Sequence, residues 1–361
     1  MGLIPKKNHV VGIDIGHSTI RIVQAEVTAG GYRISKSVTA PTPPDSVRDG
    51  LVRDPEAVGH EIKHAMKEGH IHAHHAVVAA AGGAVFVRTV PFPKMTAQLL
   101  RDSVKYEAGR YVPGSIEDSY LEAEIVGDLD ETQMEVLLAA APKDIVDSRI
   151  AACKAAGLEV EIVEIETFAA FRSLLETDAS RDVENKTFLL VDIGAVNTTV
   201  SVIEKGKYVM HRSMPNGGNT LTDGLRQAFK LDTVDAEAGK EVLDLRELLI
   251  EGSQENPPLK VIAGHIDDLI RELKRSMNYL HSQGQQNEAA PQGKVDAMFL
   301  CGGGAQLRGL DQYIQSRLGV PVQTVGVFDN PVMTQPGTLE GQGVEIAVAA
   351  GLAIRAFASA A

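Results

Sequence analysis

Two stretches of the chain end an apolar run in aspartate and glycine, and these residue types suit the binding of a metal–phosphate ligand. The residues are Asp14 with Gly16 and Asp192 with Gly194. A carboxylate suits Mg²⁺, which keeps several waters and takes one or two protein carboxylates together with phosphate oxygens. Glycine lets the backbone approach a ligand closely, so that exposed N–H groups of a turn can bind phosphate. We therefore predict that Asp14 and Asp192 hold Mg²⁺ through water.

The residues that follow each motif predict a hairpin whose turn contacts the ligand. In both stretches a short polar turn leads into an alternating strand. The turn residues expected at the ligand are His17, Ser18 and Thr19 in the first hairpin, and Asn197 and Thr198 in the second. One such motif by itself is more typical of an ordinary hairpin. Its recurrence at about half the chain length predicts two related halves.

A third motif is a run of glycines late in the chain. The apolar residues before Cys301 lead into Gly302, Gly303 and Gly304, and a helix is predicted from about residue 310 to 318. Such glycines allow the backbone to approach a flat ligand such as adenosine. The run lacks the spacing of the common phosphate loops and is weak by itself. After two aspartate hairpins it favours an adenosine site.

The elements that must position these motifs form an α/β chain with one segment of different character. The predicted order of that segment is strand 85–90, helix 96–111, strands 119–125 and 134–141, helix 143–156 and strand 160–165. This order predicts a small α+β module inserted at residues 84–160. The rest divides into a first domain made of residues 1–83, 161–183 and 335–361, and a second domain made of residues 184–334.

Composition excludes several classes of function. The formal charge is -13, which argues against a nucleic-acid partner and against attraction to anionic lipid. The two cysteines exclude a disulfide framework and a cysteine-based zinc site. No uninterrupted apolar run reaches the roughly 20 residues that span a bilayer. We therefore expect membrane association only through a partner.

The three motifs together resemble the phosphate and adenosine motifs of the actin, Hsp70 and sugar-kinase superfamily. The resemblance implies an α/β, actin-like (ribonuclease H-like) two-domain ATPase fold that binds ATP or ADP with Mg²⁺ between its halves. The segment 236–240 resembles the superfamily's Ala-Glu-x-x-Lys segment, which implies that Glu237 and Lys240 lie near the ribose and base, and a solvated helix face is the alternative explanation for both. Arg21 stands where relatives often carry lysine.

Further residues narrow the resemblance to one family. Residues 87–93, 107–108 and 111–113, and the segment 212–222 that includes Gly218, resemble type IV pilus assembly proteins of the PilM family. The resemblance runs from about residue 10 to 355, and the module at 84–160 lies where PilM and the division protein FtsA carry an extra subdomain. We see no basic amphipathic tail of the FtsA type, which favours PilM.

The resemblance also implies partners and a location. PilM receives the N-terminal cytoplasmic peptide of the inner-membrane protein PilN in a groove beside the module. Helix 96–111 and strand 85–90 are candidates for the groove wall, although core packing is the commoner use of such residues. Pilus motor ATPases are further candidate partners, and a homo-oligomer is compatible with the family. The resemblance therefore implies a cytoplasmic protein held peripherally at the inner membrane.

Two alternatives remain at this point, an FtsA-like filament-forming ATPase and a small-molecule kinase of the same superfamily. A kinase needs a general base beside the γ-phosphate. Glu166, at the end of a predicted strand, is a weak candidate for positioning a hydrolytic water, and a solvent-facing strand edge is the simpler explanation. We therefore expect slow ATP hydrolysis or none. Of the histidines, His60 and His64 have zinc-compatible spacing, but an exposed helix explains them better.

Overall fold

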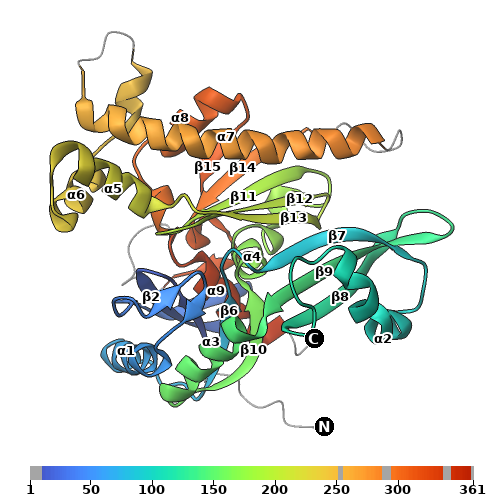
Figure 1. Cartoon of the computed structure of the whole chain (residues 1–361). Coiled ribbons are helices and arrows are strands. Elements are labelled where there is room, and N and C mark those ends of the chain that lie inside the picture. Colours follow the sequence, from blue (N-terminus) through green and yellow to red (C-terminus); the bar gives the residue numbers. More distant parts are fainter. Residues whose placement is uncertain (1–9, 251–254, 287–293, 336–342, 359–361) are drawn as a thin grey trace. The chain divides into compact units, whose positions relative to one another are not determined.

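The computed structural model describes residues 10–250, 255–286, 294–335 and 343–358 (Figure 1). The chain divides into two compact units. Unit 1 comprises Met1–Arg181, Lys207–Arg212 and Val327–Ala361, and unit 2 comprises Asp182–Gly206 and Ser213–Gly326. In the part of the chain that the structure describes, no helix is long and apolar enough to cross a membrane. Parts of the predicted outer domain segments 1–83 and 335–361 lie outside the described residues.

The main sheet of unit 1 has three parallel strands at one side, followed by two antiparallel pairings. Its strand order is β10 (Glu159–Ile165), β6 (His75–Ala80), β1 (Val10–Ile15), β2 (Thr19–Thr28), β3 (Gly31–Pro41) and β16 (Met333–Thr334). The strands β10, β6 and β1 run parallel, so their carboxyl ends meet at one edge. Every residue of β1 is buried, as expected for a central strand covered on both faces.

Helices cover the two faces of this sheet. On one face, α1 (Pro55–Glu68) and α3 (Lys143–Ala155) share a core with Ile13 and Ile22. On the other face lies α9 (Ala347–Ala358), and a Cβ at Gly12 would stand 2.1 Å from the carbonyl oxygen of Ala349. Because neighbouring strand residues point to opposite faces, Gly12 faces α9 and Ile13 faces α1 and α3. A short hairpin, β4 (Val47–Arg48) with β5 (Leu51–Val52), precedes α1.

The inserted segment forms its own small core. Its sheet has the order β7 (Phe86–Pro93), β9 (Gln133–Pro142) and β8 (Ser119–Asp128), and α2 (Ala97–Glu107) packs on it through Leu100 and Val104. The next helix and strand, α3 and β10, instead join the main core of unit 1, where Ala152 and Cys153 are fully buried. Helical spacing shows that a helix has an apolar face, but not which core that face joins. The limits of the module at 84 and 160 stay a prediction.

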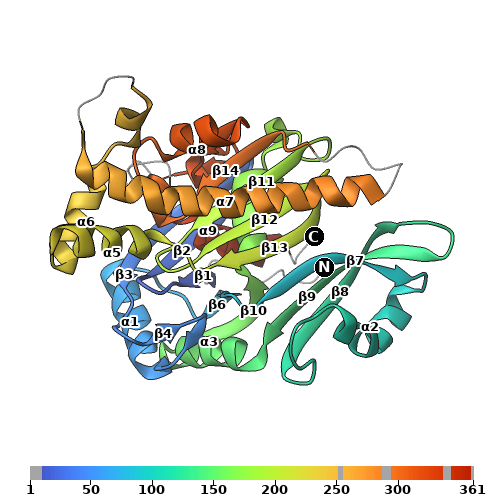
Figure 2. The same ribbon diagram turned by 45° about the horizontal axis from the view of Figure 1, so that its top comes forward.

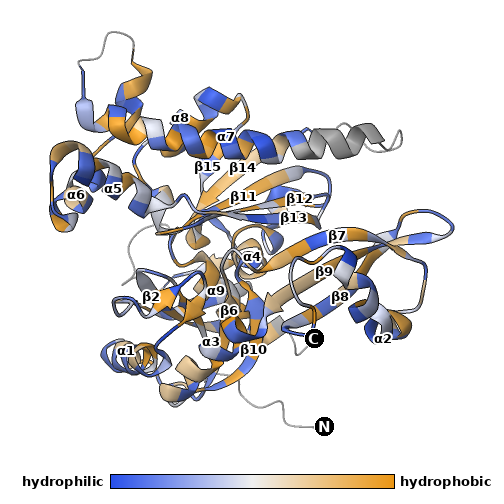
Figure 3. Cartoon of the chain, in the orientation of Figure 1, coloured by the Kyte–Doolittle hydropathy of each residue, from blue (hydrophilic) through white to orange (hydrophobic). Residues whose placement is uncertain are grey.

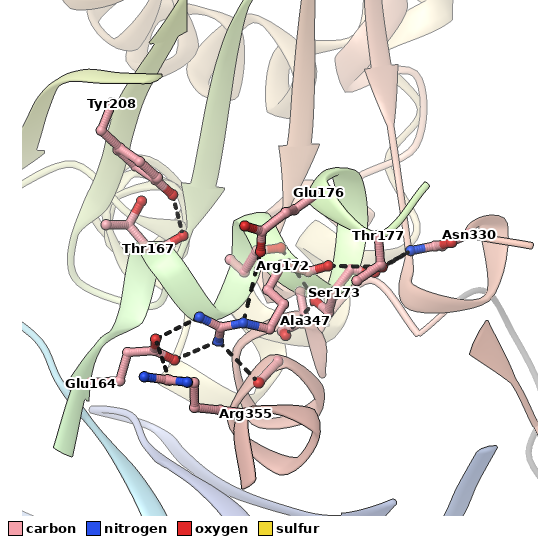
Figure 4. A network of polar contacts seen from close by, with 12 residues as sticks. Glu164, Thr167, Arg172, Ser173, Glu176, Thr177, Tyr208, Asn330, Ala347 and Arg355 are labelled. Atoms are coloured by element: carbon pink, nitrogen blue, oxygen red, sulfur yellow. Dashed lines mark hydrogen bonds and ion pairs between the residues drawn. The ribbon is translucent and has the colours of Figure 1, made fainter. Parts of the chain in front are cut away.

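A polar network within unit 1 joins β10 and α9 to the chain that follows α4 (Glu166–Phe171) (Figure 4). Arg172 begins a π-helical turn, and its two terminal nitrogens bind Glu164 at 2.6 Å each. Arg172 also donates to the carbonyl of Gly351, and Arg355 lies 3.5 Å from Glu164. Asn330 donates to the carbonyl of Ser173 at 2.9 Å. The network therefore ties the terminal helix to the segment that leaves unit 1.

In unit 2, a second sheet repeats the strand arrangement around β1. It contains β15 (Val322–Thr324), β14 (Ala297–Cys301), β11 (Thr187–Ile193) and β12 (Thr198–Glu204) in that order, with β11 antiparallel to β12 and parallel to β14. The strands β11 and β14 are strongly apolar (Figure 3). The last strand, β13 (Lys207–Met214), begins in unit 1, where Met210 pairs with Arg88 of β7.

The helices of unit 2 are α5 (Gly218–Phe229), α6 (Thr233–Glu241), α7 (Pro257–Gln286) and α8 (Leu310–Leu318). The long α7 lies over the sheet (Figure 2). Its buried residues repeat at helical spacing from Leu259 through Ile262, Ile266 and Leu269 to Leu273. The buried side of α7 is therefore a single apolar stripe along the helix.

Candidate nucleotide site

The first aspartate hairpin closes through its glycine. The Gly16 N–H donates to the carbonyl of Thr19 at 3.0 Å, and a Cβ at Gly16 would lie 2.8 Å from the same oxygen. The strand register sets Asp14 opposite Arg21, with 3.6 Å between a guanidinium nitrogen and a carboxylate oxygen. The hydroxyl of Thr42 donates to the Gly16 carbonyl at 2.8 Å. The turn is thus held from outside as well as by its own hydrogen bond.

The second aspartate hairpin has the same geometry. The Gly194 N–H donates to the carbonyl of Asn197 at 2.9 Å, and a Cβ at Gly194 would lie 2.9 Å from that oxygen. The register sets Asp192 opposite Thr199. The structure therefore confirms the internal repeat at the level of turn geometry, with Asn197 in the place of Thr19.

The predicted turn residues differ in exposure. His17 and Ser18 are exposed, while Thr19 and Asn197 are partly buried. Thr198 is fully buried, and its hydroxyl donates to the carbonyl of Asn216. Its hydroxyl therefore ties the hairpin to the turn before α5, and its predicted contact with a ligand remains untested.

Asp14 is 9% exposed, and both burial and nearby positive charges act on its carboxyl group. Burial raises its pKa above the ordinary value, and the positive charges of Arg21 and Arg149 partly offset that rise. Burial of a carboxylate is costly unless a cation compensates it. The two arginines offset the burial of Asp14 only in part, so a hydrated Mg²⁺ beside its carboxylate would add compensation, and the residue fits the expected group.

The triple glycine lies against the second hairpin. β14 pairs with β11 so that Cys301 is opposite Asp192. Gly302 has a φ of 83°, and a Cβ there would lie 2.1 Å from the Asp192 carboxylate. A Cβ at Gly304 would lie 2.4 Å from the Ile193 side chain. Glycine is required at both positions because the chain passes so close to Asp192 and Ile193. Gly303, between them, is exposed. The fold thus brings the second and third motifs together within unit 2.

The predicted residues of α5 and α6 join the same cluster. The Gly218 N–H donates to the carbonyl of Gly194 at 2.9 Å. Lys240 lies 2.6 Å from the carboxylate of Glu237 and donates to the hydroxyl of Thr222 at 3.0 Å. Its ammonium group is also 3.5 Å from the Gly218 carbonyl. Lys240 therefore lies beside the start of α5 and the second hairpin.

Three residues of this surrounding structure were not predicted, namely Thr42, Thr222 and Arg149. Thr222 follows Gly218 by one helical turn, a spacing that could have marked it. Thr42 and Arg149 act through contacts between distant segments, for which the sequence carries no local signal.

The weaker candidates find less support. Glu166 is the first residue of α4, directly after β10, and its charge acts on Arg149. A role for Glu166 in positioning water stays a prediction. His60 and His64 are exposed, and within the described residues no group of three or more His, Cys, Asp or Glu side chains could hold a metal ion.

Comparison with known proteins gives a family and a fold. The family model described as type IV pilus assembly protein PilM matches residues 12–357. A solved structure described as the PilM–PilN type IV pilus biogenesis complex superimposes with a TM-score of 0.81 and 27% identity, covering 97% of this chain and 99% of that one.

Two more distant similarities support the fold. Cell division protein FtsA of Bacillus subtilis (strain 168) is 22% identical over 258 residues, which is 64% of this chain and 57% of FtsA. The match therefore spans little more than half of FtsA. The structure of MreB 5 of Spiroplasma citri bound to AMPPNP has a TM-score of 0.53 and 16% identity, covering 99% of this chain and 98% of that one. Together with the PilM–PilN match, they confirm the actin-like two-domain ATPase fold that the resemblance implied.

Proposed function

Because the chain belongs to the family of type IV pilus assembly proteins PilM, we propose that it is a cytoplasmic ATP-binding assembly protein that binds the N-terminal peptide of a PilN-like inner-membrane protein. Support for the partner is the similarity to the PilM–PilN complex, which extends over nearly the whole of both chains. On this proposal the protein lies at the inner membrane through its partner. Pilus motor ATPases and a homo-oligomer are further predicted interactions.

The nucleotide proposal depends on one observation, that two hairpins of the same turn geometry each carry an aspartate beside a glycine turn. Exposed turn amides suit phosphate oxygens, and Asp14 and Asp192 suit a hydrated Mg²⁺. Gly302 and Gly304 let the chain after β14 pack against the Asp192 hairpin, and Glu237 and Lys240 would supply polar groups for a ribose and base. The MreB match, with its bound AMPPNP, agrees with this proposal at the level of fold.

The nucleotide proposal is tested by thermal unfolding with and without millimolar Mg-ATP. A ligand that binds only the native state stabilises it by about 2.7 kcal/mol at a concentration of 100 Kd. We expect Mg-ATP to raise the melting temperature of the wild type. It should do the same for the control Asp128→Asn, which removes an exposed carboxylate at the end of β8. Asp14→Asn and Asp192→Asn should reduce the rise. No rise in the wild type would refute nucleotide binding.

The partner proposal is tested on α2, whose outer side exposes two large apolar residues. Leu99 and Tyr106 are 53% and 74% exposed, and they lie two helical turns apart. Apolar residues seven positions apart lie on one face of a helix, which is the arrangement by which a helix makes apolar contacts with a partner. Leu99→Asp with Tyr106→Asp should abolish binding of a synthetic partner peptide and leave Mg-ATP binding unchanged. The control is Val27→Asp on β2, another exposed apolar residue of unit 1. Unchanged peptide affinity in the folded double variant would exclude this side of α2.

Sedimentation of the purified protein distinguishes the proposed function from the FtsA-like alternative, which the FtsA match keeps open. A filament former should sediment in the presence of nucleotide and stay in the supernatant without it. We expect no such nucleotide-dependent pellet.

A further inference from the structure

Arg149 heads the large side chains that are fully buried among the described residues, with 1% of its surface exposed. It lies in the middle of α3, and the function proposed above does not use it. Taking an arginine out of water is costly unless its charge and its N–H groups are compensated. The surroundings of Arg149 should therefore show what this charge is for.

The guanidinium joins three chain segments through their carbonyl oxygens. Its Nε donates to Gly50 at 3.1 Å, and its Nη1 donates to Ala79 at 3.0 Å and to Ile15 at 3.3 Å. Ile15 ends β1 and Ala79 is close to the end of β6, two parallel strands whose carboxyl ends share an edge. Ile15 lies between Asp14 and Gly16 in the chain. Arg149 therefore holds the backbone that carries the first predicted phosphate loop.

The segments around the guanidinium are packed so closely that they have little freedom to adjust. Gly50 has a φ of 86°, and a Cβ there would lie 2.0 Å from the carbonyl oxygen of Ala81. Gly82 has a φ of 110°, and its Cβ would lie 2.7 Å from the carbonyl oxygen of Asp49. The neighbouring helix residue Ser148 accepts a hydrogen bond from the Val52 N–H at 3.1 Å. Loss of the Arg149 hydrogen bonds would therefore displace the backbone at the ends of β1 and β6.

Two carboxylates at the carboxyl ends of β1 and β10 partly compensate the positive charge of Arg149. Asp14 and Glu166 are the acidic groups whose charges favour the protonated guanidinium against the opposing effect of burial. Three carbonyl oxygens require donors, but they do not require a full positive charge. A fixed charge beside Asp14 would attract phosphate, because electrostatic interactions are strong where water is excluded.

We propose that Arg149 is a positioning residue of the nucleotide site, which holds the ends of β1 and β6 in place and supplies a permanent positive charge beside Asp14. This inference rests on the nucleotide binding proposed above. Arg149 acts through the backbone at Ile15 and through its charge, and it need not touch the ligand.

The test compares neutral and charged replacements in the full chain by calorimetric titration with Mg-ATP and Mg-ADP, together with urea unfolding. Arg149→Met and Arg149→Gln remove the charge, and the second retains an amide donor should the first fail to fold. We expect both to bind nucleotide about tenfold or more weakly, the scale of a lost hydrogen-bonded charge. Arg149→Lys keeps the charge and loses part of the carbonyl contacts. It should lower stability yet keep the affinity within about threefold of the wild type.

The matched control is Arg172→Met, which removes another largely buried arginine of unit 1 that binds Glu164 and the carbonyl of Gly351. It should lower stability and leave nucleotide affinity unchanged. A folded Arg149→Met or Arg149→Gln variant with wild-type affinity would overturn the inference, as would a Lys variant as weak as the neutral ones. Failure of the wild type to bind nucleotide would refute the nucleotide binding proposed above, on which this inference rests.

Discussion

At the scale of single residues, the predicted site depends on the absence of a side chain at Gly302. Gly302 lies against the Asp192 carboxylate, and its φ of 83° and ψ of 167° belong to a region that is almost restricted to glycine. Any side chain there would displace the carboxylate predicted to hold Mg²⁺. The role of Gly302 is therefore testable apart from its effect on folding.

Gly302→Ala should weaken Mg-ATP binding by about tenfold or more in protein that remains folded, because its Cβ would occupy the place of the Asp192 oxygen. Gly319→Ala is the control. Gly319 also has a positive φ, 70°, but a Cβ at this position would meet no atom within 4 Å. It should cost about 1 kcal/mol of stability and leave affinity unchanged. Equal affinities of the two variants, measured by calorimetric titration, would contradict the prediction.

His211 should make the stability of the protein depend on pH. Both of its ring nitrogens are buried without a hydrogen-bond partner in the described structure, and burial lowers its pKa from 6.5 to about 4. The unfolded chain therefore takes up a proton near pH 6.5 that the folded chain resists. Stability from this group is complete above pH 6.5 and falls by about 3 kcal/mol as the pH drops to 4. The His211→Phe variant should lose less stability than the wild type over that pH range, as measured by urea unfolding. Parallel stability–pH profiles of the two proteins would contradict this.

At the scale of elements, close helix packing organises unit 1. Gly351 of α9 meets α4 so closely that a Cβ would lie 1.8 Å from the carbonyl oxygen of Ala169. The same helix crosses β1 at Gly12. Glycine at these two contacts lets a helix approach both a strand and another helix, and the network of Arg172 and Glu164 then holds α9 there (Figure 4).

Gly351→Ala should therefore destabilise the protein by about 3 kcal/mol, the usual scale of overpacking. Gly264→Ala is the matched change in the exposed part of α7, where no atom lies within 4 Å of the new Cβ. It should stabilise the protein by about 0.5–1 kcal/mol, because alanine is the better helix former. The difference between the two midpoints of urea unfolding measures the contact. Similar midpoints would show that α9 can shift to make room.

At the scale of the whole molecule, each of the two units carries one aspartate hairpin of the same turn geometry. The sequence offers Glu166 as a weak candidate for positioning water, and that role stays a prediction. A nucleotide with a structural role needs affinity more than turnover.

We therefore expect the purified protein to hydrolyse ATP far more slowly than the roughly 1–100 turnovers per second of kinases. Phosphate release should be measured with and without candidate sugars, with Asp192→Asn as the control for contaminating ATPases. Rapid turnover that this substitution abolishes would contradict the prediction, and stimulation by a sugar would favour the kinase alternative.

The amino-acid sequence by itself determined the family, the actin-like fold and the two aspartate hairpins, because each of these signals lies within a few consecutive residues. Asp14 with Gly16 and Asp192 with Gly194 could be paired from their local context alone. Only the tertiary structure decided which segments meet. It placed α3 in the main core, engaged the Thr198 hydroxyl with Asn216 and surrounded Arg149 with the carbonyls of three distant segments. Helical and strand periodicity shows which face of an element is apolar, but the choice of partner depends on packing between residues far apart in the chain.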